Sequence, residues 1–121
     1  MNIHNCSFTN NYAFVDGGSI NLLIQKVESS RSIEIANCIF DDDENIANIE
    51  ITDTQNGAFI SYLVDSSNNN PALHINSCKF LGENNRFHSD ENFDEKGGCI
   101  YISVSYSEQK GTNNIENCTF T

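Results

Sequence analysis

The sequence predicts a right-handed parallel β-helix, an all-β solenoid of about three coils of 32–40 residues with three short strands per coil. Two recurring phrases carry this prediction. A Gly-led phrase starts at Gly17, Gly57 and Gly97, 40 residues apart each time. The phrase Ile-x-x-Cys-x-Phe places its cysteine at positions spaced by 32, 40 and 40 residues, which are Cys6, Cys38, Cys78 and Cys118. The predicted hand follows the strong right-handed preference of parallel crossover connections.

The first predicted strand of each coil follows the glycines. Apolar residues alternate there with other residues, which is typical of a strand with one face turned inward. The inward set is Ile20, Leu22, Ile24, Ile60, Tyr62, Val64, Ile100, Ile102 and Val104. The outward set is Ser19, Asn21, Leu23, Phe59, Ser61, Leu63, Cys99, Tyr101 and Ser103. Because the outward set contains no Asp, Glu, Lys or Arg, we expect a flat sheet that is unsuited to proton transfer at neutral pH.

The second predicted strand ends in a bend. Ile33 and Ile35 alternate as before, but Cys38 follows Ile35 by three residues, so an uninterrupted strand would not bury both. The residue before the cysteine is Asn5, Asn37, Ser77 or Asn117. Asn tolerates left-handed backbone angles better than other non-Gly residues. A sharp bend at this residue is therefore expected to turn the cysteine and the following phenylalanine, on a third short strand, toward the core.

The repeats cover the whole chain. Residues 1–121 are therefore predicted to form a single β-helix segment with repeat boundaries near the four motif cysteines. The sequence opens and closes within the Asn-Cys-x-Phe phrase and shows no capping repeat, which favours a piece of a longer solenoid. Its exposed strand edges are expected to favour end-to-end self-association. The sequence contains no predicted membrane span and no secretory leader.

The formal net charge of −11 at pH 7 argues against nucleic acid and anionic membranes as partners. Eleven of the 17 carboxylates lie in two long loops, at residues 41–56 and 81–96. A solvated acidic rim is the favoured interpretation. Calcium stays open because it takes several oxygen ligands, although the spacing matches no EF-hand loop. No cofactor and no metal-binding or catalytic residue is otherwise predicted.

The four motif cysteines are predicted to form an inward column of thiols, since Cys packs well as a small apolar residue. The chain has no Cys-x-x-Cys pair, so zinc is not favoured. Disulfides between neighbouring coils are conceivable at the spacing of a β-sheet but would be strained there. The fifth cysteine, Cys99, is predicted to point outward and is the best candidate for a reactive thiol.

Neither the histidines nor the two N-glycosylation patterns require a functional explanation. His4, His74 and His88 do not recur in register and are interpreted as surface or turn residues. Asn5-Cys6-Ser7 and Asn117-Cys118-Thr119 fit the N-glycosylation pattern. The predicted bend already explains both asparagines, so the pattern is weak evidence for secretion.

Two motifs resemble those of a known family. Phe8-Thr9-Asn10-Asn11 followed by Gly17-Gly18-Ser19-Ile20 is similar to the paired Phe-x-x-Asn and Gly-Gly-Ala-Ile motifs of the polymorphic outer membrane proteins. Phe40 and Phe80 are followed by Asp43 and Glu83 where that family has Asn. The bend resembles the asparagine ladder of the pectate-lyase-like fold. These resemblances imply a surface-exposed, adhesin-like β-helix, and no catalytic residue carries over.

The sequence therefore favours a non-catalytic surface or secreted repeat module for adhesion, display or binding of a protein or glycan partner. Its expected location is the cell surface or the extracellular space. One alternative is a segment of a pectate-lyase-like, polysaccharide-processing enzyme whose active residues lie elsewhere. Asp90 and Asp94 in the second acidic loop are the residues whose substitution would test that alternative. A purely structural spacer is the second alternative.

Overall fold

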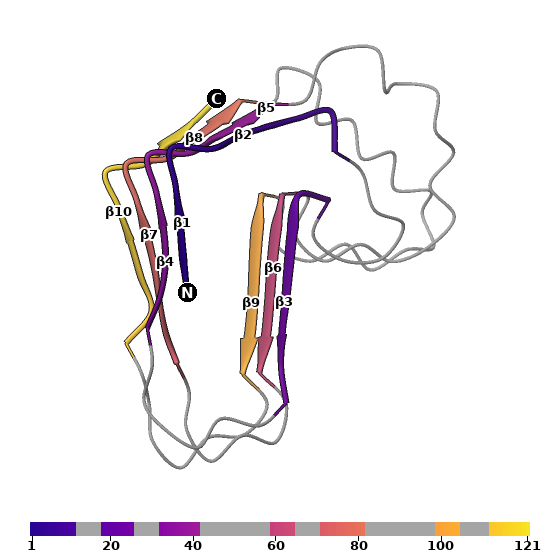
Figure 1. The fold of residues 1–121 in the computed structure, drawn as a ribbon, viewed down its shortest axis with the longest axis vertical. Coiled ribbons are helices and arrows are strands. Elements are labelled where there is room, and N and C mark those ends of the chain that lie inside the picture. Colours follow the sequence, from indigo (N-terminus) through magenta and orange to yellow (C-terminus); the bar gives the residue numbers. More distant parts are fainter. Residues whose placement is uncertain (12–17, 26–31, 42–58, 65–70, 82–98, 105–111) are drawn as a thin grey trace.

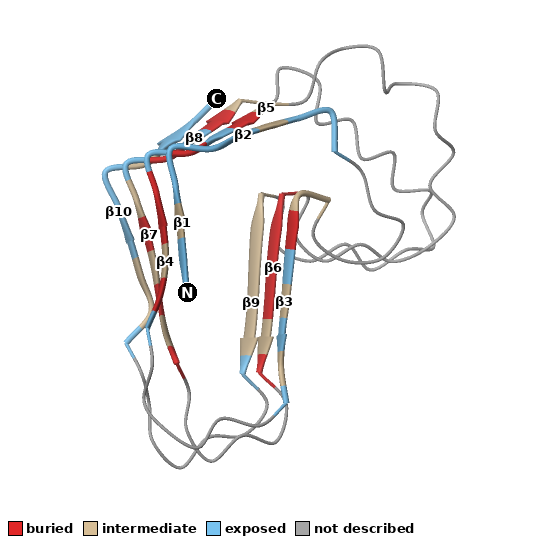
Figure 2. Cartoon of the chain, in the orientation of Figure 1, coloured by how far each residue is buried: buried red, intermediate tan, exposed pale blue. Residues whose placement is uncertain are grey.

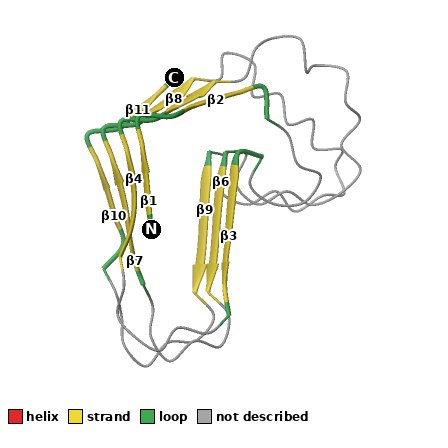
Figure 3. Ribbon diagram, viewed as in Figure 1, coloured by secondary structure: helices red, strands yellow, loops and turns green. Residues whose placement is uncertain are grey.

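A computed structural model describes residues 1–11, 18–25, 32–41, 59–64, 71–81, 99–104 and 112–121. These residues form strands and turns and no helix (Figure 3). Accordingly, no described segment is a helix that could span a membrane. The strands are parallel and stack in three sheets, which is the arrangement of a β-solenoid (Figure 1).

Each sheet is named here for its repeated residues. The Ile sheet contains β1 (Asn2–His4), β4 (Ser32–Ala36), β7 (Ala72–Asn76) and β10 (Asn114–Glu116). The Phe sheet contains β2 (Ser7–Thr9), β5 (Ile39–Asp41), β8 (Lys79–Leu81) and β11 (Thr119–Phe120). The Gly-led sheet contains β3 (Ile20–Ile24), β6 (Ile60–Val64) and β9 (Ile100–Val104). The Ile and Gly-led sheets face each other, and the Phe sheet lies across one end of the space between them (Figure 1).

The core lies between the sheets and follows the repeat register. Equivalent residues of successive coils are direct partners, such as Ile3 with Ile35 and Ile35 with Ile75. The second and third coils provide most of the buried side chains, whereas the first and last strands are more exposed (Figure 2). The fully buried apolar side chains, each below 2% exposed, are Tyr62, Phe40, Phe59, Phe80, Ile35, Ile60, Leu73, Ile75, Val64, Cys38 and Cys78. Stacking of coils is therefore what excludes water, because one coil alone leaves both of its flanks open.

A stack of four phenylalanine rings runs along the Phe sheet. The ring centroids are 4.9 Å apart from Phe8 to Phe40, 4.9 Å from Phe40 to Phe80 and 4.8 Å from Phe80 to Phe120. The planes deviate from parallel by 3°, 5° and 7°. The ring spacing equals the distance between neighbouring strands of a sheet, so the register of the strands dictates the ring stack.

The predicted bend before each motif cysteine is confirmed. The backbone φ angle is 56° at Asn5, 54° at Asn37, 54° at Ser77 and 54° at Asn117, which is the left-handed region. Ile35 and Cys38 are 0% and 1% exposed on either side of the exposed Asn37. The Asn37 amide donates to Asn76 O (3.0 Å) and the Ile39 amide donates to Cys6 O (2.9 Å), so hydrogen bonding between coils continues across the bend.

A second left-handed residue, Asn10, follows the Phe sheet with φ 55° and was not predicted. It stands two residues after Phe8, and the equivalent sequence positions are Asp42 and Gly82. Those two positions lie outside the described residues. Asp and Gly both suit left-handed backbone angles, so this column of the repeat held the signal for a second bend.

The predicted outward orientation of Ser19, Phe59 and Cys99 is wrong. Phe59 is 0% exposed, and its ring centroid lies 5.9 Å from that of Phe40 and 6.0 Å from that of Phe80. Cys99 packs against the core cluster, and the Ser19 hydroxyl is buried. These three residues therefore face the core immediately before the residues that begin β3, β6 and β9.

Backbone hydrogen bonds explain this correction. The amides of Phe59 and Ile60 both donate to Cys99 O, each at 3.1 Å. In the preceding coil, the amides of Ser19 and Ile20 donate to Phe59 O at 3.1 and 2.9 Å. Two consecutive amides of one coil thus share one carbonyl of the next, and the chain bends there before each Gly-led strand. A bend interrupts the alternation of side chains, so the bend residue and the first residue of the following strand can both face inward.

Candidate binding surface

The outer face of the Gly-led sheet is not the open, flat surface that the sequence predicts. Ser61 lies between the core residues Ile60 and Tyr62 and so belongs to the outer face, yet it is 0% exposed. Its hydroxyl has no hydrogen-bond partner. Asn21 and Leu23 on the neighbouring β3 are exposed. This face is therefore accessible at β3 but closed at the middle of the sheet.

The outer face of the Ile sheet offers a larger set of polar side chains. Strand alternation places outward the residues that flank the isoleucines, and the described outward positions are Asn2, His4, Ser32, Glu34, Ala36, Ala72, His74, Asn76, Asn114 and Glu116. Register aligns Asn2, Glu34, His74 and Asn114 in one column, and His4, Ala36, Asn76 and Glu116 in the next. We name this outer face the polar face. This face was not predicted, although the polar residues that alternate with Ile33 and Ile35 were a sequence signal for it.

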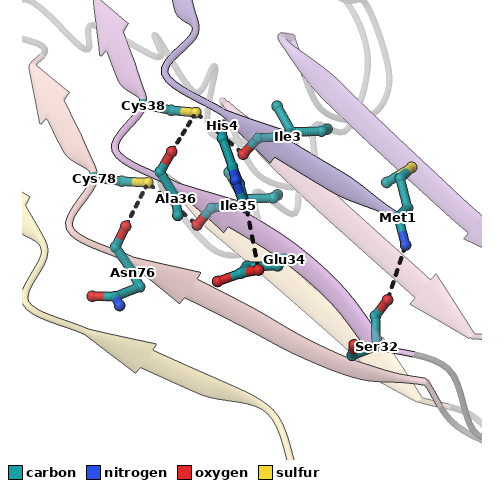
Figure 4. A network of polar contacts seen from close by, with 10 residues as sticks. All are labelled: Met1, Ile3, His4, Ser32, Glu34, Ile35, Ala36, Cys38, Asn76 and Cys78. Atoms are coloured by element: carbon teal, nitrogen blue, oxygen red, sulfur yellow. Dashed lines mark hydrogen bonds and ion pairs between the residues drawn. The ribbon is translucent and has the colours of Figure 1, made fainter.

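An imidazole–carboxylate pair lies at one end of the polar face. His4 Nε2 lies 3.2 Å from Glu34 Oε2, and both side chains are about two-fifths exposed, at 41% and 43% (Figure 4). Glu34 is also the direct register partner of His74 on β7. His4 and His74 are surface residues, as predicted, but the register brings both to the strand that carries Glu34. Exposed ion pairs contribute only about 0–1 kcal/mol to stability, so these groups remain available to a ligand at little cost.

Amide groups dominate the other end of the polar face and the adjacent bend. Asn117 Nδ2 donates to Asn76 Oδ1 at 3.2 Å, and Ser77 Oγ donates to the same oxygen at 2.9 Å. Asn114 Nδ2 donates to the Glu116 carboxylate. The bend residues Asn5, Asn37, Ser77 and Asn117 are all exposed, so their side chains lie at the surface and do not line the core. The resemblance to an asparagine ladder is thus limited to the recurring bend and the Asn117–Asn76 contact.

The motif cysteines stack at the corner between the Ile and Phe sheets. The four motif cysteines form no disulfide, and the predicted inward column holds best in the middle coils, where Cys38 and Cys78 are buried. Cys118 is half-buried and Cys6 is exposed. Figure 4 shows the Cys38 and Cys78 side chains pointing the same way from successive coils. We call this set, Cys6, Cys38, Cys78 and Cys118, the thiol column.

Each thiol of the column donates a hydrogen bond to the backbone. Cys38 Sγ lies 3.3 Å from Ala36 O and 3.6 Å from Ile3 O of the preceding coil. Cys78 Sγ likewise lies 3.4 Å from Asn76 O and 3.6 Å from Ile35 O. A thiol can thus satisfy carbonyl oxygens next to the bend while it packs as an apolar group, which explains why cysteine recurs at this position.

Burial raises the pKa of the Cys78 thiol to about 11. A backbone hydrogen bond from Cys38 lowers this pKa in part, and repulsion from the neighbouring Cys38 and Cys118 groups raises it further. Desolvation disfavours the charged form of any acid. The Cys78 thiol is therefore protonated at neutral pH in the protein as described.

Of the remaining residues that the sequence singled out, Cys99 lies among the described residues and several others do not. Cys99 packs partly against the core cluster, which removes the argument for it as an outward reactive thiol. Among the described residues, no three or more His, Cys, Asp or Glu side chains converge on a possible metal position. The calcium hypothesis for loops 41–56 and 81–96 lies outside the described residues except for Asp41 and Leu81, as do His88, Asp90 and Asp94.

Comparison with known proteins identifies no relative. No protein-family model matches this chain, and no curated protein and no solved structure matches it. The class that its fold defines is an all-β solenoid of parallel stacked strands. Membership of a narrower family depends on the motifs alone.

Proposed function

We propose that this chain is a non-catalytic β-helix module that holds a partner on its polar face. The observation that carries the proposal is the in-register array of imidazole, carboxylate and amide groups on the outer face of the Ile sheet. Neighbouring strands hold these groups about 4.8 Å apart. The backbone therefore sets their spacing before a partner arrives, which lowers the entropic cost of binding.

The chemistry of this face favours a polar partner. Its described outward positions include two His, two Glu and three Asn and no aromatic or large aliphatic side chain. Such groups donate and accept hydrogen bonds, so a glycan or a polar protein surface suits them. The net charge of −11 disfavours acidic polymers. An uncharged glycan is therefore the partner to test first.

The finer family assignment belongs to this proposal. The motifs around Phe8 and Gly17 support a right-handed β-helix similar to the polymorphic outer membrane proteins. On that reading, the chain acts at a cell surface or outside the cell, in attachment or display.

The test is a glycan-array binding experiment with matched variants. Glu34→Ala/His74→Ala removes the centre of the polar face, and Lys79→Ala on the outer face of the Phe sheet is the control. Binding that is lost in the double variant and retained in Lys79→Ala supports the proposal. Binding that both proteins retain equally, or release of reducing sugar ends during the assay, contradicts it.

A further inference from the structure

The thiol column has a geometry that the binding proposal does not use. Its four cysteines come from equivalent positions of successive coils, and the residues that follow them are register partners throughout. Neighbouring sulfurs therefore repeat at the spacing of parallel strands, about 4.8 Å. Figure 4 shows Cys38 and Cys78 leaving their coils in the same direction, so a line joining their sulfurs runs along the stack.

We propose that neighbouring cysteines of the thiol column bind Cu(I), with one ion held linearly between two sulfurs. Thiolates are the protein ligands that select Cu(I). A metal–sulfur bond of about 2.3 Å, the length known for zinc, places two sulfurs about 4.6 Å apart on opposite sides of an ion. This distance is close to the strand spacing. Side-chain rotation is therefore enough to form the site, and the strands stay where they are.

The number of ligands decides the kind of ion. A structural zinc site needs four ligands, and no three metal-binding side chains converge among the described residues. A straight column provides only the sulfur above and the sulfur below any ion placed within it. Two-coordinate binding is the arrangement that a column permits, and Cu(I) accepts it.

The binding step is an exchange of protons for metal. Two thiols release two protons to solvent and form two Cu–S bonds, which leaves one negative charge at each site; no electron is transferred. The thiol hydrogen bonds to backbone oxygens are lost. Ala36 O then still accepts the Asn5 amide at 3.1 Å, so that oxygen keeps a partner.

Four sulfurs make two such sites. Cys6 with Cys38 forms one, and Cys78 with Cys118 forms the other. Each pair combines one buried sulfur with one that solvent reaches, since Cys6 is exposed and Cys118 is half-buried. Copper can therefore enter each pair from its accessible member, and part of the residual charge stays hydrated. The expected stoichiometry is two Cu(I) ions per chain.

The experiment compares variants with equal numbers of thiols but different spacing. In a Cys99→Ala background, C6A/C38A keeps the neighbours Cys78 and Cys118. C6A/C78A keeps Cys38 and Cys118, which lie two strand spacings apart, about 10 Å. Each variant loses one exposed and one buried cysteine. Each protein is titrated anaerobically with Cu(I), and thiolate-to-copper absorption and bound copper are measured after gel filtration.

We expect two ions in the Cys99→Ala protein, one in C6A/C38A, and at least tenfold weaker binding in C6A/C78A. X-ray absorption should report two sulfur neighbours for each copper. The reverse pair repeats the test at the other end and remains informative if one variant fails to fold: C78A/C118A keeps neighbours, and C38A/C118A does not. Equal binding by a spaced and a neighbouring pair would overturn the proposal, as would three or more sulfur neighbours or copper that bridges two chains.

Discussion

Two turns of each coil, the Asn-Cys corner and the entry to the Gly-led strand, differ in how clearly the sequence predicts them. At the Asn-Cys corner, one residue with φ near 54° turns the chain from the Ile sheet to the Phe sheet, and Cys and Phe recur after it in every coil, with Asn before the Cys in three coils and Ser77 in the fourth. At the entry to the Gly-led strand, the chain bends where two amides share one carbonyl of the next coil, and the inward residue is Ser19, Phe59 or Cys99. The direction of a side chain was predicted correctly where its residue type recurs in successive coils. It was predicted wrongly at the entry to the Gly-led strand, where the residue type varies.

The difference has a packing origin. In the Phe sheet, each ring stacks on an identical ring in the next coil, so a change of residue would interrupt the whole stack. At the entry bend, Phe59 packs against both Phe40 and Phe80, and the equivalent positions carry the much smaller Ser19 and Cys99. The position of Ser19, Phe59 and Cys99 at the entry bend therefore accepts side chains of different size. Its residue type varies from coil to coil, as residue types do at surface positions, although the side chains face the core.

Phe59→Ala tests the inward direction of the residue at the entry to the Gly-led strand. Because Phe59 is fully buried against two rings of the stack, its loss should reduce the free energy of unfolding by about 3–5 kcal/mol. Leu23→Ala is the control on the exposed side of the same sheet, at 56% exposed, and should change stability by about 0.5 kcal/mol or less. Urea unfolding measures both. If the Phe59→Ala protein were as stable as the Leu23→Ala protein, the Phe59 side chain would have to lie on the outer face.

The core of the two middle coils should also be sensitive to alkaline pH. Burial raises the pKa of Tyr62 from 10.0 to about 12, and that of Cys78 from 9.0 to about 11. The unfolded chain therefore loses these protons first, so stability is complete below about pH 9 and falls as pH rises from 9 to 12. Each group should account for a loss on the order of 2–3 kcal/mol across its window.

Urea unfolding at a series of pH values measures this loss. Tyr62→Phe should remove the part of the slope between pH 10 and 12, although it also removes the 2.7 Å hydrogen bond from the Tyr62 hydroxyl to Pro71 O. Cys78→Ala should remove the part between pH 9 and 11. A double variant with the same pH dependence as the unchanged protein would show that neither group controls it.

The Asn-Cys corner is tested by two substitutions at Asn37. With φ at 54°, a β-branched residue is strained, so Asn37→Val should destabilise the fold by about 1–3 kcal/mol. Asn37→Gly reaches the same angle without steric cost and should be tolerated, with a change of about 1 kcal/mol or less. Thermal and urea unfolding of the two variants give the comparison. Equal stability of the Val and Gly variants would mean that the left-handed corner is not required.

The weakest effect on stability is expected from removal of the buried Ser19 hydroxyl at the entry bend. The Ser19 hydroxyl is buried and has no hydrogen-bond partner. A buried polar group without a partner costs about 1–3 kcal/mol, so Ser19→Ala should leave stability unchanged or raise it by about 1 kcal/mol. Ser7→Ala is the matched control, because the Ser7 hydroxyl is exposed and lies 3.4 Å from Thr9 Oγ1. A marked loss of stability in Ser19→Ala would show that the hydroxyl has a partner.

The stacked parallel strands and the Asn-Cys corner could both be predicted from the sequence. Ile35 and Cys38 are three residues apart and both apolar, so strand geometry demanded a bend between them, and Asn37 supplied the residue type that permits it. The stacking of Cys on Cys and Phe on Phe followed from the constant spacing of the repeats. These properties depend on local backbone limits and on periodicity, and both are visible in a single sequence.

The direction of Phe59, the burial of Ser61 and the contacts of the polar face depend on how the coils pack and could not be predicted from the sequence. Phe59 turns inward because two amides of its coil share one carbonyl of the next, and no residue type encodes that hydrogen bond. His4 meets Glu34 because parallel register brings residues 30 positions apart in the chain to within 3.2 Å. Side-chain alternation is a property of one strand. Contacts between strands depend on how the coils stack, which is why the sequence indicated the faces of the solenoid but not which of them would stay open.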